Sequence, residues 1–181
     1  MEILDVVTKD GVPTGETVER ACAHRNGIMH RTSHVWIYAR ENGKTYFLLQ
    51  KRCLSKDSYP GCYDISSAGH IPAGVDFVPS ALRELEEELG IVAGEEELLF
   101  CGLRYVEADA EFHGIPYHDR QVSGVYALER PKSTGFRLQK EEIESVLWME
   151  FTEVCEKVSR RAIPTCIDYE ELEMLRGQLL H

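Results

Sequence analysis

The sequence predicts an α+β fold, in which strands and helices follow one another along the chain. Residues 34–39 are rich in the β-branched and aromatic side chains that strands favour. The Asn42-Gly43 pair that follows is typical of a tight hairpin turn. Residues 79–89 are predicted to form a helix that ends at Gly90, a residue that adopts the left-handed conformation of a helix end at little cost. One chain therefore contains clear signals for both kinds of element.

The first part of the chain is predicted to be mainly extended. Residues 2–7 form a short strand, and residues 17–25 fit an extended piece followed by a helical turn. Residues 46–52 are expected to pair with residues 34–39 across the Asn42-Gly43 turn. This region should therefore contain a hairpin.

The middle of the chain combines short strands with loops. Residues 63–67 are a strand candidate, and residues 69–74 form a loop of glycine and proline that leads into the helix over 79–89. Three further strands are predicted over residues 98–106, 121–128 and 145–151. The segment between the first two of these, residues 108–118, is expected to be a loop that contributes to specificity.

The C-terminal part is predicted to be helical. Thr152 can cap a helix that runs to about residue 160, and Pro164 interrupts the chain after it. Residues 168–180 should form the last helix, because apolar side chains recur there at helical spacing. No internal repeat or linker is evident, so residues 1–181 are predicted to form a single domain.

Composition excludes several classes of function. Hydrophobic residues make up 43% of the chain, which is too many for a disordered protein, and no window of about 18 apolar residues predicts a membrane span. The 31 acidic residues outnumber the 20 basic ones, and a net charge of −11 repels nucleic-acid backbones. The expected partner is therefore a small molecule, with neither nucleic acid nor membrane involved.

The N-terminal residues and the cysteines indicate the compartment. Residues 1–5 lack the basic segment and apolar run of a signal peptide, so a cytoplasmic location is expected. The six cysteines are scattered and form no Cys-x-x-Cys pair, which argues against a structural zinc site. In that compartment, we expect them to be reduced thiols. No pattern defines the oligomeric state, and a homodimer is left open.

An acidic face on the helix over 79–89 is the main chemical signal. Glu84, Glu87 and Glu88 are three or four residues apart and share one helix face, where their like charges repel. A solvated acidic surface is the plain interpretation. However, a glycine-rich loop precedes the helix and Gly90 ends it, and this combination favours a site for a hard divalent cation such as Mg²⁺.

This segment resembles the Nudix box, in which a glycine precedes a helix of the pattern Arg-Glu-apolar-x-Glu-Glu-x-Gly-apolar. Gly69 matches its first position, and the second half matches at Arg83, Glu84, Leu85, Glu87, Glu88, Gly90 and Ile91. The isolated glutamate of the box falls on Val75, with Asp76 beside it. The resemblance implies a Nudix fold, an α/β/α sandwich with a mixed sheet between helices. It also implies hydrolysis of a nucleoside diphosphate linked to another group.

The resemblance assigns roles to the matching residues. Glu87 and Glu88 match metal ligands, Glu84 matches a third ligand or the base that activates water, and the carbonyl of Gly69 joins the metal shell. The cofactor is expected to be Mg²⁺ or Mn²⁺. Either Glu84 or Glu88 is expected to take the proton of the attacking water.

A further pattern lies outside the box, in Thr14-Gly15-Glu16, His30-Arg31, Leu49-Gln50-Lys51-Arg52 and the segment from Lys56 to His70. With these motifs, residues 1–128 resemble the Nudix subgroup related to isopentenyl-diphosphate isomerase. In that enzyme, a cysteine stands where this chain has Ala68, and a later catalytic carboxylate aligns with Gln121. Neither an alanine nor a glutamine side chain can shuttle a proton, which favours a hydrolase over an isomerase. The alternatives are isomerase-like activity and a binding module without turnover.

Three histidines loosely match a separate metal site of the isomerase: His24, His30 and His70. A hydrogen-bonded structural histidine is the plainer interpretation of each. Asp119 fits a base, an extra ligand or a substrate contact, with a turn cap as its plainer role.

Basic side chains are needed to hold the outer phosphate of a diphosphate. Arg52 and Lys56 are the first candidates, with Arg31 and Lys51 as alternatives. Lys51 and Arg52 point to opposite faces of their strand, so at most one of them faces the site. The substrate stays open among nucleoside phosphates, nucleotide sugars, dinucleotides and isoprenoid diphosphates.

Overall fold

A computed structural model describes residues 2–180 of the chain. Its strands are β1 (Ile3–Val7), β2 (Pro13–Glu19), β3 (His30–Glu41), β4 (Lys44–Arg52), β5 (Tyr63–Asp64), β6 (Ser67–His70), β7 (Leu98–Phe112), β8 (Ile115–Glu129) and β9 (Ile143–Glu150). Its helices are α1 (Arg20–Asn26), α2 (Phe77–Leu89), α3 (Phe151–Ser159) and α4 (Tyr169–Leu179), and Glu95–Glu97 form one 3₁₀ turn. None of the helices in residues 2–180 has the length and apolar character needed to span a membrane.

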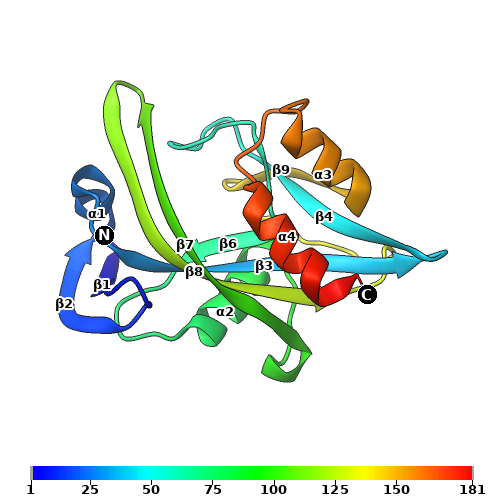
Figure 1. Cartoon of the computed structure of the whole chain (residues 1–181), viewed down its shortest axis with the longest axis horizontal. Coiled ribbons are helices and arrows are strands. Elements are labelled where there is room, and N and C mark those ends of the chain that lie inside the picture. Colours follow the sequence, from blue (N-terminus) through cyan, green and yellow to red (C-terminus); the bar gives the residue numbers. More distant parts are fainter. Residues whose placement is uncertain (1, 181) are drawn as a thin grey trace.

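A mixed sheet with the strand order β5-β4-β3-β8-β7 forms the centre of the molecule, and β1 and β2 pair separately (Figure 1). Strand β3 pairs antiparallel with β4 and β6 and parallel with β8. Strand β9 pairs with the other side of β4. The long central strand β3 thus brings segments from the whole chain together.

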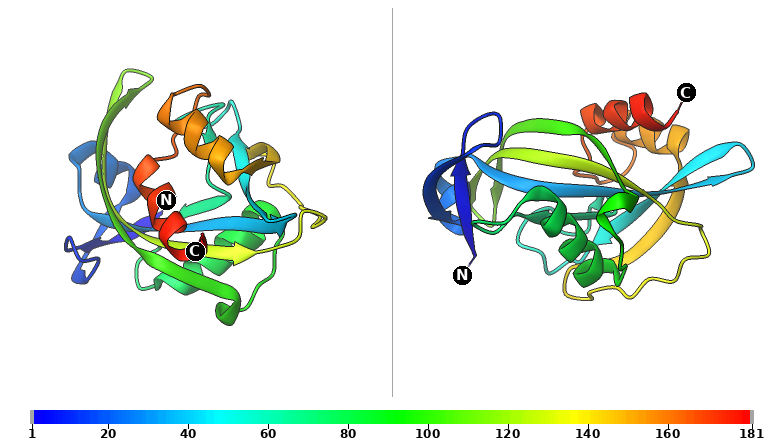
Figure 2. Two further views of the ribbon diagram at one scale, coloured as in Figure 1. Left: turned by 45° about the vertical axis from the view of Figure 1, so that its right-hand side comes forward. Right: turned by 90° about the horizontal axis from the view of Figure 1, so that it is seen from below.

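Helices cover both faces of this sheet (Figure 2). Helix α2 packs on one face, where Leu85 and Leu89 meet Ile37 of β3 in one apolar cluster. Helices α3 and α4 cover the other face, where Phe151 and Leu172 belong to a second cluster. From Val35 to Tyr38, both faces of β3 are therefore apolar. The α/β/α arrangement confirms the predicted fold class.

Local signals account for several element ends. Asn42 and Gly43 both have a positive φ, which is the geometry of the tight turn that their sequence predicts. Gly90 ends α2 with a φ of 69°. Asp168 begins α4, where its side chain accepts a hydrogen bond from the backbone N–H of Glu170.

Three expectations need correction. Residues 108–118 are not a loop, because β7 and β8 continue as a paired hairpin to the turn at His113-Gly114. Helix α3 begins at Phe151, so Thr152 lies inside its first turn and donates to the Glu150 side chain instead of capping the helix. Gly69 and His70, expected in a loop, belong to β6, since β3 offers them a pairing edge.

Candidate active site

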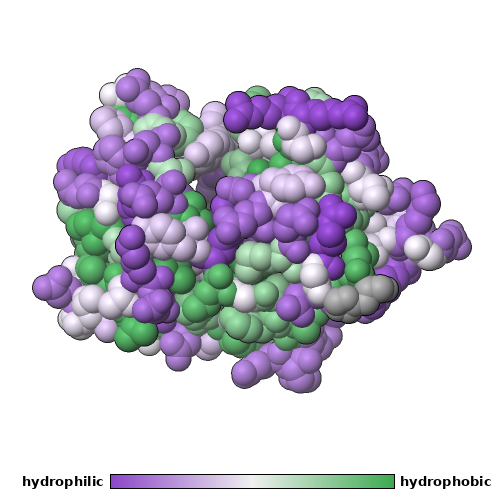
Figure 3. Space-filling view, viewed as in Figure 1, coloured by the Kyte–Doolittle hydropathy of each residue, from purple (hydrophilic) through white to green (hydrophobic). Residues whose placement is uncertain are grey.

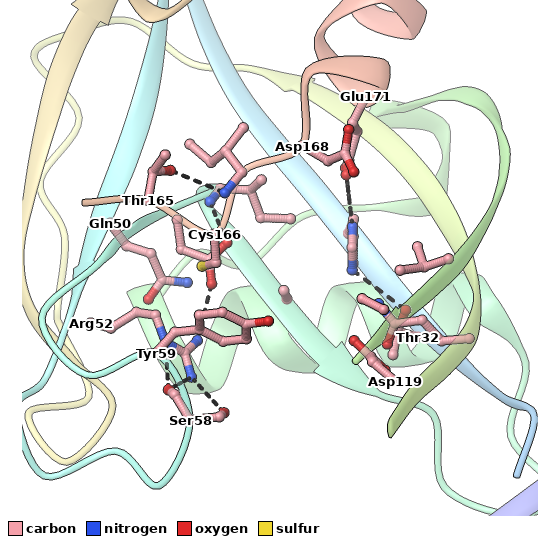
Figure 4. Close-up of a pocket in the computed structure, with 18 of the residues that line it drawn as sticks. Thr32, Gln50, Arg52, Ser58, Tyr59, Asp119, Thr165, Cys166, Asp168 and Glu171 are labelled. Carbon is pink, nitrogen blue, oxygen red and sulfur yellow. Dashed lines mark hydrogen bonds and ion pairs between the residues drawn. The ribbon is translucent and has the colours of Figure 1, made fainter. Parts of the chain in front are cut away.

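A cavity of about 880 Å³ opens between the β7–β8 hairpin and the side of the molecule that carries α3 and α4 (Figure 3). Its floor comes from β3, β4 and β6, and its outer wall comes from residues 158–171. Figure 4 shows Arg52 and Tyr59 on one side, Thr32 and Asp119 on another, and Glu171 above them. The cavity lining brings together Arg52, Lys56, His70, Glu88 and Asp119, whereas Glu84, Glu87, His24 and His30 are not part of it.

Helix α2 and strand β6 position the predicted metal ligands. Glu88 lines the cavity with 7% of its surface exposed, and its Oε2 accepts a hydrogen bond from the backbone N–H of Ala68 at 3.3 Å. Glu84 packs against Gly69, where a Cβ atom would lie 2.1 Å from the Glu84 Cδ. Glu87 is half exposed, and Arg83 donates to both Glu84 (2.5 Å) and Glu87 (2.7 Å).

Burial makes this carboxylate group costly without a cation. Loss of solvent contact raises the pKa of Glu84 to about 7 and that of Glu88 to about 8, and repulsion between the carboxylates adds to both shifts. The donors are all oxygen atoms, which suit Mg²⁺ or Mn²⁺. Gly69 has no side chain, so Glu84 can lie directly against β6. The buried oxygen donors of this group therefore fit a divalent cation.

Arg31 is not brought to the cavity, contrary to its expected role as an alternative phosphate contact. It is buried, and it donates to the Asp5 carboxylate at 3.0 Å and to the Val75 carbonyl at 2.8 Å. The Asp5 carboxylate also accepts the N–H of Gly74 at 2.9 Å. The loop before α2 is therefore held mainly through its backbone, with a longer contact of 3.5 Å from Arg31 to the Asp76 carboxylate. The side chain of Val75 takes no part in these hydrogen bonds.

Arg52 and Lys56 both line the cavity, whereas Lys51 lies outside it and pairs with Glu144. Arg52 contacts the Asp64 carboxylate at 3.0 Å and the Ser58 carbonyl, and Lys56 pairs with Glu142. The two predicted cations are thus present on the wall, and each already has a carboxylate partner.

Strand β8 adds Asp119 and Gln121 to the cavity, together with Ala68 from β6. The Asp119 Oδ1 is buried without a hydrogen-bond partner, and burial raises the pKa of Asp119 to about 6. Ala68 and Gln121 are the two positions where the resemblance to the isomerase predicts a cysteine and a carboxylate.

A cluster of three histidines lies next to Asp119. The ligand atoms of His24, His30 and His70 lie within 4.8 Å of one another, and Nε2 of His24 is 3.0 Å from Nε2 of His70. The Asp119 Oδ1 is 3.9 Å from the His24 Nδ1. Burial lowers the pKa of all three histidines, that of His24 to about 3. Neutral imidazoles with an unpartnered carboxylate oxygen beside them fit a divalent transition metal.

Sequence reasoning missed the C-terminal wall of the cavity. Arg161 lies there with a φ of 50°, and Glu171 lies deeper with 2% of its surface exposed. Glu171 accepts hydrogen bonds from His34 and Trp36 of β3. Its only sequence signal is its position next to the apolar Leu172 at the start of α4.

The comparisons agree with this arrangement. The family model described as NUDIX domain matches residues 29–166. Nudix hydrolase 3 of Arabidopsis thaliana is 40% identical over 172 residues, which cover 93% of this chain and 22% of that protein. The chain therefore spans about a fifth of the length of this relative.

Two further proteins resemble the chain at lower identity. The isopentenyl-diphosphate Delta-isomerase of Escherichia coli is 27% identical over 150 residues, which cover 82% of this chain and 77% of that protein. The crystal structure of DR0079 from Deinococcus radiodurans superposes with a TM-score of 0.71 at 18% identity, covering 95% of this chain and 98% of that one. The structural likeness at this identity concerns the fold.

Proposed function

Because the chain belongs to the NUDIX domain family, we propose that it is a divalent-cation-dependent hydrolase of a diphosphate linkage in a nucleoside diphosphate-type substrate. The observation that carries this proposal is the group of three α2 glutamates beside β6: Glu84 packs against Gly69, Glu88 lines the cavity, and Glu87 is linked to Glu84 through Arg83. The buried charges of Glu84 and Glu88 call for a cation, and the cavity next to Glu88 has room for a substrate.

Glu84, Glu87, Glu88 and the carbonyl of Gly69 would hold Mg²⁺ or Mn²⁺. A divalent cation at this position would neutralise phosphate charge and lower the pKa of a bound water. Arg83 ties Glu84 to Glu87 and thereby keeps the two carboxylates close together. The loop held by Arg31 fixes the start of the helix that carries them.

Glu88 is the better placed of the two candidate bases. It lines the cavity, whereas Glu84 packs against Gly69 on β6. In the proposed step, the water oxygen forms a bond to phosphorus while the bond from phosphorus to the leaving phosphate oxygen breaks. Glu88 accepts the proton of the water.

Arg52 and Lys56 are proposed to face the outer phosphate from the β4 side of the cavity. Their partners Asp64 and Glu142 hold them in place before substrate arrives. Asp119 is proposed to meet a hydroxyl group of the substrate or a second cation, because its unpartnered oxygen needs a donor or a metal.

Two features disfavour isomerase chemistry as the alternative. Ala68 and Gln121 both line the cavity, and neither side chain can carry a proton to or from carbon. The carboxylates of α2 are intact, which supports hydrolysis rather than binding without turnover.

The histidine cluster is proposed as a second cation site, separate from the α2 carboxylates. His24, His30 and His70 would hold the ion, with Asp119 beside them. Metal analysis of the purified protein checks this, because His70→Ala should lower the bound transition metal. An unchanged metal content in this variant would count against the site.

The test of the proposed function is phosphate release from a panel of nucleotide and isoprenoid diphosphates with Mg²⁺ or Mn²⁺. Glu88→Gln should lower turnover by more than about 100-fold. Loss of a group that only supports a metal ligand costs about 10- to 100-fold in metal affinity or activity, and loss of a ligand costs at least as much. Glu88→Gln should stay folded, because the substitution removes a charge whose burial is unfavourable.

Glu86→Gln is the matched control, because Glu86 lies on the same helix but is exposed. It should retain full activity. Near-normal turnover by Glu88→Gln would contradict the metal assignment. No release from any compound by the folded wild-type protein would contradict the proposed hydrolase activity for this panel.

A further inference from the structure

Most cations of the cavity are already neutralised. Four arginine or lysine side chains on its wall pair with carboxylates: Arg20 with Glu2, Arg52 with Asp64, Lys56 with Glu142, and Arg104 with Asp168. A diphosphate that reached these side chains would compete with groups of the protein for their hydrogens. An oriented donor without such a partner would be free to bind the diphosphate.

His34 on β3 has such a nitrogen. Its Nδ1 donates to Glu171, at 3.0 Å from Oε1 and 3.2 Å from Oε2. Among residues 2–180, the other ring nitrogen, Nε2, meets only the Thr32 hydroxyl, at the long distance of 3.4 Å. That hydroxyl already has a closer partner in Ser123 at 2.8 Å. His34 and Thr32 both line the cavity, so the hydrogen-bonding capacity of Nε2 is available there.

Glu171 is held firmly in its position. The Trp36 Nε1–H donates to its Oε1 at 2.8 Å, and Arg104 contacts its Oε2 at 3.5 Å. Figure 4 shows Glu171 on the helix side of the cavity and Thr32 on the strand side, joined by the dashed contacts of this group. The imidazole between them has one orientation, and Glu171 acts as its positioning residue.

His34 lines the same cavity as Glu88, one of the proposed cation ligands. His34 is directly opposite Ala68 in the β3–β6 pair, so their side chains share one face of the sheet. The backbone N–H of Ala68 donates to Glu88, which belongs to the metal-binding group. His34 and Glu88 both line the cavity, so a diphosphate bound there can reach the imidazole as well as a cation at Glu88.

We propose that His34, positioned by Glu171, is a substrate contact that donates a hydrogen bond from Nε2 to an oxygen of the bound diphosphate. This inference rests on the proposed function. The residues that contact the phosphate would then include one on the central strand β3, positioned by one on helix α4. No motif of the sequence predicts a phosphate contact at these places.

The charge around His34 supports a donor rather than an acceptor. Burial disfavours the charged ring, but the Glu171 carboxylate and its hydrogen bond raise the pKa of His34 above its ordinary value. Asp64 acts in the same direction and Arg104 against it. Asp119 also faces the ring from β8. In the imidazolium form, both ring nitrogens carry hydrogen.

The first test measures binding of methylenediphosphonate, a diphosphate analogue that cannot be hydrolysed, by titration calorimetry with Mg²⁺ present. His34→Ala should weaken binding about tenfold or more, the effect of one hydrogen bond to a charged group. Glu171→Gln keeps a hydrogen-bond partner for the ring and should weaken binding less. His118→Ala is the matched control, because His118 pairs with Asp109 away from the cavity and should leave binding unchanged.

The second test separates a substrate contact from a purely structural role. In ¹⁵N NMR spectra, addition of Mg²⁺ and methylenediphosphonate should shift the Nε2 resonance of His34, which His34→Gln identifies by its loss. An unshifted Nε2 resonance in a protein that binds the analogue would overturn the proposal, as would wild-type affinity in His34→Ala. If the wild-type protein binds no diphosphate and hydrolyses none, the proposed function fails, and this inference fails with it.

Discussion

Gly69 sets the distance between strand β6 and helix α2. A side chain at this position would run into Glu84, whose carboxylate carbon lies 2.1 Å from where a Cβ would be. The obstructing atoms belong to the end of a flexible side chain, so the fold can accommodate alanine by moving Glu84. The proposed metal-binding group would then lose its geometry while the hydrophobic core stays intact.

We therefore expect Gly69→Ala to fold with a melting temperature close to that of the wild type but to bind Mn²⁺ at least about tenfold more weakly. Electron paramagnetic resonance titration of free Mn²⁺ measures the affinity directly. Gly135→Ala is a suitable control, because no atom lies within 4 Å of a Cβ placed there. Equal Mn²⁺ affinity in the two variants would show that Glu84 is not a ligand.

Helix α3 ends in a Schellman motif that has an arginine in the position where glycine is usual. The N–H of Arg161 donates to the Val158 carbonyl, and the N–H of Ala162 donates to the Lys157 carbonyl. Arg161 has a φ of 50° and lines the cavity, and within residues 2–180 it forms no ion pair. Backbone strain at a cavity wall is typical of a functional position.

Arg161→Gly should stabilise the protein by about 0.5–1 kcal/mol, because glycine adopts this conformation without strain. The same change should raise KM about tenfold, since it removes a free cation from the cavity. Urea unfolding and steady-state kinetics on the best substrate of the panel measure the two effects. Asn42→Gly, at the remote β3–β4 turn with a φ of 52°, should leave KM unchanged.

The two halves of the site differ in how far they could be predicted. Helix α2 and its glutamates follow from spacing alone, because residues three or four apart share a helix face whatever surrounds them. Which arginine faces the substrate depends on tertiary contacts that spacing does not show. Arg31 forms an ion pair with Asp5, and a β-bulge between Lys51 and Arg52 alters the register at the end of β4.

The extension of the β7–β8 hairpin and the wall at Glu171 were not predicted, for different reasons. Residues 107–112 alternate acidic residues with Ala108, Ala110 and Phe112, which is the two-residue period of a half-buried strand. Alanine, aspartate and glutamate are depleted in strands, however, and this composition weakens the signal. A single glutamate next to an apolar stripe becomes meaningful only when His34 and Trp36 are known to lie opposite it. Contacts between residues more than 130 positions apart have no local signature.

At the scale of the whole molecule, the His34–Glu171 pair links helix α4 to the central strand and makes stability depend on pH. The raised pKa of His34 contributes stability that is complete below about 6.5 and is lost as the pH rises through the folded value. The lowered pKa of Glu171 contributes stability above about 4.5 that is lost as the pH falls. The contribution of the pair is therefore largest between these two values.

Urea unfolding of the wild type and Glu171→Gln at several pH values measures this dependence. The difference in unfolding free energy between the two proteins should be largest near pH 5.5 and smaller at about pH 3 and pH 9. Glu173→Gln serves as a control, because Glu173 lies on the same helix in an exposed pair with Arg176. A difference that does not vary with pH would show that the pair makes no electrostatic contribution.

The parallel pairing of β3 with β8 joins residues that are about 90 positions apart, from His30 with Gln121 to Tyr38 with Glu129. Closing a loop of this length is entropically costly, and such contacts slow folding more than hairpins do. The intervening segment contains α2, so the helix with the glutamates can form while the opposite wall is still absent. A ligand that needs both walls binds only after this closure, and it therefore stabilises the completed fold over every partly folded form.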